Sequence, residues 1–214
     1  MQMLLCGVDE AGKGPVFGPM VTGGILVEDV SSLENLGIKD SKQLTVKKRE
    51  EIFAHLTSSY KYYTVVKSPQ EIDARPSTMN AFTVSCHAEV VRALRPDKVF
   101  LDACDVNAKR FGVNVISASG VSAEVVSEHK ADDKYLIVGA ASIIAKVTRD
   151  RLVEELKVEF GDIGSGYPSD PQTIRFLEEY IRMHGEAPSC ARKSWKTVSE
   201  ALSRCRQKNL TDFF

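Results

Sequence analysis

The chain has 214 residues, of which 43% are hydrophobic and 27% charged, and its formal net charge is −1. This length and apolar content support one medium-sized domain with a sizeable core. The nearly neutral charge argues against a protein coated with basic residues for nucleic acid, so any nucleic-acid surface must be local.

Three further features of the sequence narrow the class of protein. Five scattered cysteines without a Cys-x-x-Cys pair fit a reducing cytosol better than a disulfide framework. Four histidines without a His-x-x-x-His pair argue against a zinc site. The first apolar run stops at Asp9, too early for a signal peptide, and no apolar stretch is long enough to span a bilayer. We therefore expect a cytoplasmic protein that makes no contact with membranes.

The first half of the chain alternates between short apolar runs and helical periodicity. Runs rich in β-branched residues predict strands, and a capping residue before an i, i+4 stripe predicts a helix. In chain order we predict a buried strand over Leu4–Val8, a strand region over Val16–Val27, a loop over Ser31–Leu44, a helix over Val46–Leu56 capped by Thr45, a strand over Tyr60–Lys67 and a helix over Thr78–Leu94.

Helices dominate the second half of the chain. In order, we predict short strands over Val99–Leu101 and Val113–Ile116, a long helix over Tyr135–Phe160, a helix that begins at Asp170 and Pro171, and a last helix over Trp195–Gln207. Strands come early and helices follow, which predicts an α/β core with a helical C-terminal extension.

Four acidic residues stand where predicted strands end or where a helix is about to begin. Asp9 and Glu10 end the first strand, Asp102 ends the strand over Val99–Leu101, and Asp132 precedes the long helix. In open α/β sheets ligands collect beyond the strand ends, where the first and fourth strands could bring Asp9 and Asp102 together.

Several carboxylates at one point predict either protonation or bound cations. Two like charges about 4 Å apart repel by roughly 4 kcal/mol at an effective dielectric near 20. Ligation by oxygen alone suits Mg²⁺ or Mn²⁺, and two such ions can activate water for phosphodiester hydrolysis.

Simpler interpretations of these residues stay open. A strand-end aspartate is more often a turn residue or a helix cap than a ligand, and spacing alone does not decide Asp102 and Asp132. The pair Asp9-Glu10 before a glycine turn favours a functional role. The segment from Gly7 to Gly14 also nearly matches the P-loop Gly-x-x-x-x-Gly-Lys-Ser/Thr, but Gly14 stands where the hydroxyl that binds Mg²⁺ is needed.

Five motifs along the chain resemble those of ribonuclease HII in its archaeal form, and the match runs from about Leu4 to Trp195. The motifs are Gly7-Val-Asp-Glu-Ala-Gly-Lys-Gly14, Asp40-Ser-Lys42, His129-Lys-Ala-Asp132, Ala140-Ala-Ser-Ile-Ile-Ala-Lys146 and Gly164-Ser-Gly-Tyr-Pro-Ser-Asp170. The resemblance implies a ribonuclease H-like mixed β-sheet core flanked by helices. It implies an endoribonuclease that hydrolyses the RNA strand of RNA–DNA hybrids and cuts 5′ of single ribonucleotides in duplex DNA. Two metal ions would assist, leaving a 3′-hydroxyl and a 5′-phosphate.

The same resemblance assigns the catalytic, metal-binding acids and the cofactor. It implies that Asp9, Glu10, Asp102 and Asp132 hold Mg²⁺ or Mn²⁺, with two ions during catalysis. Asp105 is the alternative to Asp102, which we prefer because it directly follows the apolar strand. Two other classes remain as alternatives: a P-loop-like nucleotide phosphatase, and a non-catalytic hybrid-binding adaptor, which would need one of the four acids replaced.

The expected substrate-binding residues are Gly12, Lys13, Gly14, Lys42 and Tyr167. RNA differs from DNA by its 2′-hydroxyl, and a glycine turn lets main-chain groups approach that sugar closely. The family often carries Arg where this chain has Lys13, and Lys lacks the bidentate fork. The ring or hydroxyl of Tyr167 would contact the same ribose. Lys42 belongs to a basic cluster suited to phosphates, and the basic residues from Arg192 to Lys208 predict a second positive patch.

The C-terminal tail carries a motif of its own. Gln207, Leu210, Phe213 and Phe214 match the pattern Gln-x-x-Leu-x-x-Phe-Phe, which resembles the peptide that docks replication proteins onto the sliding clamp PCNA. The three apolar residues share one helical face and would fill a groove, with Gln207 at its rim. The alternative is that both phenylalanines pack on the protein's own core.

The predicted division of roles has three parts, which are a catalytic core over residues 1–160, a substrate-binding helical extension over 161–206 and a clamp-binding tail over 207–214. We expect a monomer whose partners are RNA–DNA hybrid, ribonucleotide-containing duplex DNA and PCNA.

Overall fold

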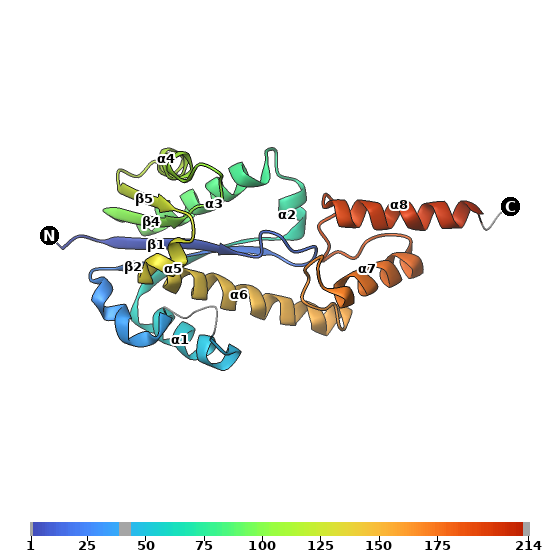
Figure 1. Ribbon diagram of the computed structural model, residues 1–214, viewed down its shortest axis with the longest axis horizontal. Coiled ribbons are helices and arrows are strands. Elements are labelled where there is room, and N and C mark those ends of the chain that lie inside the picture. The colour runs from blue at the N-terminus through green and yellow to red at the C-terminus, as the bar shows by residue number, and fades with distance from the viewer. Residues whose placement is uncertain (1, 39–43, 212–214) are drawn as a thin grey trace. The chain divides into compact units, whose positions relative to one another are not determined.

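The computed structural model describes residues 2–38 and 44–211 (Figure 1). The chain divides into two compact units. The first comprises Met1–Ala11, Val21–Val66 and Pro76–Arg149, and the second comprises Gly12–Met20, Lys67–Arg75 and Asp150–Phe214. Each unit therefore draws on segments that are far apart in the sequence. The predicted boundaries at residues 160 and 206 separate a catalytic core, a substrate-binding extension and a clamp-binding tail. This division by role stays a prediction.

A mixed five-stranded sheet forms the centre of the first unit, in the order β3-β2-β1-β4-β5. β1 pairs antiparallel with β2 and parallel with β4, and β4 pairs parallel with β5. The predicted α/β class with a mixed sheet is therefore confirmed. The strands are β1 (Leu5–Ala11), β2 (Met20–Val27), β3 (Lys61–Lys67), β4 (Lys98–Asp102) and β5 (Glu124–Glu128).

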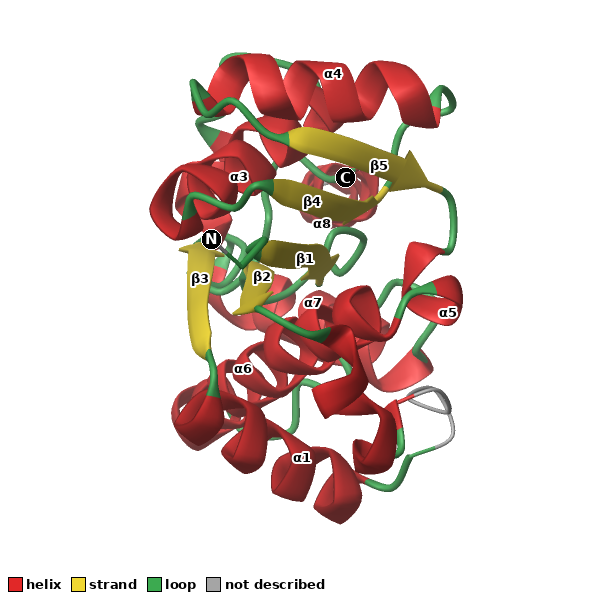
Figure 2. Cartoon of the chain, turned by 90° about the vertical axis from the view of Figure 1, so that its left-hand side faces the viewer, coloured by secondary structure: helices red, strands yellow, loops and turns green. Residues whose placement is uncertain are grey.

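Helices cover both faces of this sheet (Figure 2). α3 and α4 lie on one face, and α1 and the first part of α6 lie on the other. The helical segments are η1 (Val30–Leu36), α1 (Val46–Ser59), α2 (Pro69–Asp73), α3 (Met79–Leu94), α4 (Ala108–Ser119), α5 (Ala131–Lys134), α6 (Leu136–Phe160), α7 (Pro171–His184) and α8 (Lys196–Thr211).

Glycines in the two central strands let helices approach the sheet closely. A Cβ atom on Gly7 of β1 would lie 2.2 Å from the carbonyl oxygen of Ile137 in α6, and one on Gly23 of β2 would lie 2.9 Å from that of Ala141. These distances are shorter than any normal contact, so only glycine allows α6 to lie this close to the sheet. Gly24 makes the same room for Val90 of α3 on the opposite face.

The predicted helix starts follow local capping chemistry. Thr45 accepts a hydrogen bond from the Lys48 N–H, and Thr78 accepts one from the Ala81 N–H, so each side chain satisfies a donor of the first helical turn. Asp170 caps α7. Hydrogen bonds to Asp170, chiefly from Ser165, lower the pKa of its carboxyl to about 2. The helices expected after these caps are confirmed.

The predicted strand over Val113–Ile116 is wrong, because this segment lies within α4. Asn107 caps the helix, and Phe111 and Val115 are buried one turn apart on its inner face. Gly112 lets this face lie against β5, where a Cβ would come within 2.7 Å of the Ser127 side chain. β5 itself was not predicted, because its short run has a glutamate at each end.

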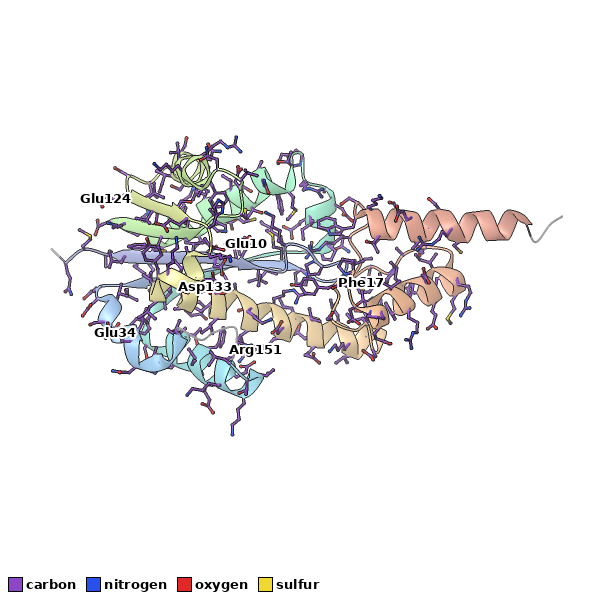
Figure 3. All side chains as sticks on the ribbon, viewed as in Figure 1. Glu10, Phe17, Glu34, Glu124, Asp133 and Arg151 are labelled. Atoms are coloured by element: carbon purple, nitrogen blue, oxygen red, sulfur yellow. The ribbon has the colours of Figure 1, made fainter. Side chains whose placement is uncertain are left out.

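The second unit is built around the segment between β1 and β2. Phe17 is buried and meets the ring of Phe176 of α7 edge-on, with the ring centroids 5.5 Å apart. Figure 3 labels Phe17. Residues of α7 and α8 complete this core, among them Leu177, Ile181 and Val198. The α7 and α8 helices thus share one hydrophobic core with the segment between β1 and β2.

All five cysteines are free, as expected for a chain without a disulfide framework. Among the helices of residues 2–38 and 44–211, none combines the length and the apolar character needed to cross a bilayer.

We predict that Gly7→Ala lowers the free energy of unfolding by at least about 2 kcal/mol, because the new methyl group would displace α6 from β1. The matched control is Gly14→Ala, since a Cβ at Gly14 meets nothing within 4 Å. Its effect should stay within about 0.5 kcal/mol. Urea unfolding of both variants measures the difference, and equal stabilities would contradict the close packing of α6 on Gly7.

Candidate active site

The parallel pairing of β1 and β4 brings two of the predicted acids to one edge of the sheet. Val8 stands opposite Leu101 in the register, so Asp9 and Asp102 are the next residues on their neighbouring strands. Asp9 and Asp102 are therefore neighbours as the sequence predicted, but Asp9 and Glu10 do not end their strand, because β1 continues to Ala11. The role of these two residues as metal ligands stays a prediction.

Asp9 is the most deeply placed of the four acids, with only 6% of its surface exposed. Its Oδ1 accepts a hydrogen bond from the Glu10 N–H at 2.7 Å, and its carboxylate also interacts with the hydroxyl of Ser142 on α6. Burial raises the pKa of Asp9 well above its usual range, and the nearby charges of Glu10 and Asp102 raise it further.

Glu10 is held by a histidine that the sequence analysis did not single out. His87 Nε2 lies 2.8 Å from Glu10 Oε2, and the histidine side chain is fully buried. Its ring meets Phe111 edge-on, with centroids 5.1 Å apart. The spacing Thr83, His87, Val90 places His87 on the buried face of α3, which could have indicated an inward-pointing histidine.

Asp102 is tied to the segment that carries the fourth acid. Its Oδ1 accepts a hydrogen bond from the Ala131 N–H at 2.7 Å, at the start of α5, and Asp132 follows on the same short helix. Burial raises the pKa of Asp102, and the charges of Asp132 and Glu10 raise it further. The charges of Glu10 and Asp102 therefore act on Asp9, and those of Asp132 and Glu10 act on Asp102. Glu10 on β1 and Asp133, the neighbour of Asp132, are labelled in Figure 3.

Asp105, the alternative to Asp102, has a different set of partners. It pairs with Arg110 at 2.6 Å and accepts a hydrogen bond from the Asn107 N–H. The side-chain hydrogen bond from Arg110 lowers the pKa of Asp105. Its carboxylate is thus stabilised as an anion within the loop that leads into α4, which favours Asp102 as the third acid of the site.

The donors of this site fit a hard divalent cation. Oxygen ligands from partly desolvated carboxylates suit Mg²⁺ or Mn²⁺, and a cation would offset the repulsion that raises the pKa values of Asp9 and Asp102. Within the described part of the chain, however, no three His, Cys, Asp or Glu side chains already surround a single metal position. Asp9 and Asp102 instead accept hydrogen bonds from main-chain N–H groups, and Glu10 pairs with His87.

The predicted substrate-binding residues lie in other parts of the chain. Gly12, Lys13 and Gly14 form a turn of the second unit, in which Gly12 takes a φ of 82° that favours glycine. Tyr167, in the loop before α7, belongs to the same unit, and its side chain is 39% exposed.

Several predicted residues lie outside the described structure. Lys42, Phe213 and Phe214 are outside the described residues, as are the side chains of Gln207 and Leu210. Arg192, assigned from the sequence to a surface patch, is instead fully buried. That part of the charge interpretation is wrong, because the carbonyl groups of the glycine turn surround the guanidinium.

Solved structures define the class of protein to which this fold belongs, which is ribonuclease H-like. The ribonuclease H2 of Pyrococcus horikoshii superposes with a TM-score of 0.92 at 44% identity, covering 96% of this chain and 100% of the other. The ribonuclease HII of Archaeoglobus fulgidus, solved in complex with PCNA, superposes with a TM-score of 0.85 at 43% identity, covering 91% and 96%.

Sequence comparisons then give the family. The profile of ribonuclease HII matches residues 6–198. A ribonuclease HII of Methanocorpusculum labreanum is 67% identical over 212 residues, which are 99% of this chain and 100% of the relative. The chain belongs to the ribonuclease HII family, and it is an endoribonuclease of RNA–DNA hybrids.

We predict that Asp9→Asn stabilises the metal-free protein more near pH 8 than near pH 5. The folded pKa of Asp9 is raised above its ordinary value of 3.8. Between these two pKa values the folded state binds a proton that the unfolded state has lost, so wild-type stability falls as pH rises. Asparagine cannot ionise, so the variant does not lose this stability as pH rises.

Thermal unfolding in EDTA at the two pH values measures this effect. A difference in Tm between variant and wild type that is the same at both pH values would show that ionised Asp9 is not penalised in the fold.

Proposed function

We propose that this enzyme cuts both the RNA strand of RNA–DNA hybrids and the 5′ side of a single ribonucleotide embedded in duplex DNA, leaving a 3′-hydroxyl and a 5′-phosphate. Asp9, Glu10, Asp102 and Asp132 would hold Mg²⁺ or Mn²⁺. The observation that carries this proposal is the pairing of β1 with β4, which sets Asp9 beside Asp102 where each ionised carboxylate raises the other's free energy.

The chain's own residues orient the acids before any cation binds. The Ser142 hydroxyl and the Glu10 N–H fix Asp9, His87 fixes Glu10, and the Ala131 N–H fixes Asp102. Two divalent cations held by this set would supply an activated water and stabilise the charge on the leaving 3′ oxygen. Prepositioned ligands reduce the reorganisation needed when substrate and cations bind together.

Recognition of the ribonucleotide is assigned to the glycine turn and to Tyr167. The main chain of Gly12, Lys13 and Gly14 would contact the 2′-hydroxyl, the group that distinguishes RNA from DNA. The exposed part of Tyr167 would lie against the same sugar. Lys42, outside the described residues, would contact a phosphate of the substrate.

The competing functions have less support. A P-loop would need a phosphate-binding loop from Gly7 onward, whereas Gly7, Asp9 and Glu10 all lie within β1. A non-catalytic adaptor would need one acid replaced, and all four carboxylic acids are present in the sequence.

The C-terminal tail is proposed to bind a sliding clamp. The relative from Archaeoglobus fulgidus was solved in complex with PCNA, and it is 43% identical to this chain. α8 continues to Thr211, so its last turns include Gln207 and Leu210 of the predicted docking peptide. Phe213 and Phe214 would complete the apolar face that enters the clamp's groove.

We predict that Asp102→Asn lowers kcat/KM by at least about a hundredfold on duplex DNA with one embedded ribonucleotide, because a charged ligand is lost. The matched control, Asp105→Asn, should cut near the wild-type rate, because it loses only the ion pair with Arg110. A gel assay with and without Mg²⁺ measures both. If Asp105→Asn is inactive and Asp102→Asn is not, the third acid has been assigned wrongly.

We predict that deleting residues 207–214 abolishes binding to the cognate sliding clamp and leaves cleavage of short substrates nearly unchanged. The deletion removes the docking peptide but none of the proposed catalytic acids. Titration calorimetry with the clamp measures binding. The deletion also shortens α8. The double variant Phe213→Ala with Phe214→Ala is the control for this, because it removes the two phenylalanine side chains and keeps the length of the helix. Full clamp affinity after truncation would contradict the proposal, and a large fall in Tm would instead support packing of the phenylalanines on the core.

A further inference from the structure

A fully buried arginine in the second unit is surrounded by carbonyl groups of the glycine turn. Arg192 Nη2 donates to the Gly12 carbonyl at 2.6 Å, and its Nη1 donates to the Lys13 carbonyl at 2.9 Å. Its Nε and Nη2 also donate to the Gly18 carbonyl, at 3.1 and 3.0 Å. One guanidinium therefore fixes both ends of the loop from Gly12 to Gly18.

The planarity of the peptide bond gives these hydrogen bonds a second consequence. In a trans peptide, the carbonyl of one residue and the N–H of the next point in opposite directions, and the described chain contains no cis peptide. Because the Gly12 and Lys13 carbonyls point toward the guanidinium, the N–H groups of Lys13 and Gly14 point away from it. Gly14 itself is exposed.

Trp195 holds the third carbonyl of the turn. Its indole N–H donates to the Gly14 carbonyl at 3.2 Å, and the guanidinium of Arg192 lies over its ring, 5.0 Å from the centroid. The guanidinium of Arg75 lies 5.3 Å from the same ring. All three carbonyls from Gly12 to Gly14 are thus bound by two side chains that are close together in the sequence.

The segment that carries these side chains is itself anchored. Asp73, the last residue of α2, accepts hydrogen bonds from the Lys193 and Ser194 N–H groups at 2.6 and 3.0 Å. The Arg192 N–H donates to the Val16 carbonyl at 2.9 Å. The segment that holds the turn is therefore itself fixed by hydrogen bonds to Asp73 and to Val16.

Burying a guanidinium is costly, and an apolar side chain would fill the same space at lower cost. Arginine supplies several donors in one plane, which a lysine or an apolar residue cannot reproduce. We propose that Arg192, with Trp195, is a positioning residue that presents the N–H groups of Lys13 and Gly14 to the 2′-hydroxyl of the ribonucleotide. This inference rests on the proposed function, and it identifies what makes the turn selective for ribose.

The test compares Arg192→Lys and Arg192→Met with the wild-type enzyme on two substrates. On duplex DNA with one ribonucleotide, kcat/KM should fall about tenfold more than on a long RNA–DNA hybrid, the loss expected for one or two misplaced hydrogen bonds. A single ribose offers one 2′-hydroxyl, whereas a hybrid offers many sites at which cleavage can occur. Equal losses on the two substrates would overturn the inference.

The matched control is Leu177→Ala, which removes a fully buried side chain from the core of the same unit without touching the turn. It should lower Tm while leaving the ratio of kcat/KM on the two substrates unchanged, with each variant assayed equally far below its own Tm. If the ratio of kcat/KM on the two substrates changes as much for Leu177→Ala as for the Arg192 variants, the role of Arg192 is only structural.

Trp195→Phe provides an independent variant if the Arg192 variants do not fold. It keeps an aromatic ring and removes the indole N–H, so the ratio should shift in the same direction by a smaller factor. An unchanged ratio in Trp195→Phe would then overturn the inference. If the wild-type enzyme itself does not cut the single-ribonucleotide duplex, the proposed function fails, whereas a cutting wild type with unaltered variant ratios refutes only the positioning role.

Discussion

The close approach of α6 to β1 is the constraint on which the first unit depends. Gly7 leaves the backbone of Ile137 in contact with the strand, and no side chain could be accommodated there. That contact places Ser142 of α6 within reach of Asp9, and it brings the start of the helix, preceded by α5, to the end of β4. A packing requirement at one glycine thus fixes the surroundings of the acids before any chemistry is considered.

Electrostatic repulsion and burial act together at this site. Asp9 and Asp102 are adjacent on parallel strands and partly removed from water, and both effects raise their pKa values. Apolar residues at these positions would make the fold more stable. The hydrogen bonds from Ser142 and the Ala131 N–H reduce the cost and also fix the direction of each carboxylate. The repulsion between these carboxylates destabilises the metal-free fold. A bound divalent cation would relieve this repulsion, which favours its binding.

In the second unit, too, apolar packing and polar contacts have separate roles. Its hydrophobic core, around Phe17 and Leu177, supports the fold, whereas the hydrogen bonds of Arg192 and Trp195 fix a short turn that has little core of its own. In both units, buried polar groups orient the residues assigned to function, and apolar packing holds those polar groups in place. This arrangement keeps the groups that would contact substrate small, either carboxylates or main-chain N–H donors, while larger side chains behind them set their geometry.

Local patterns determined much of this protein. The caps at Thr45, Thr78 and Asp170 are chemical signals within four residues, and the strands that carry Asp9 and Asp102 could be read from short apolar runs. Tertiary structure decided what depends on distant partners. The run Val113–Ile116 fits a strand or a helix, and burial against β5 selected the helix. His87 meets Glu10 from 77 residues away, and Arg192 meets Gly12 from 180 residues away. No local pattern encodes such pairs, because their energies exist only once the chain is folded.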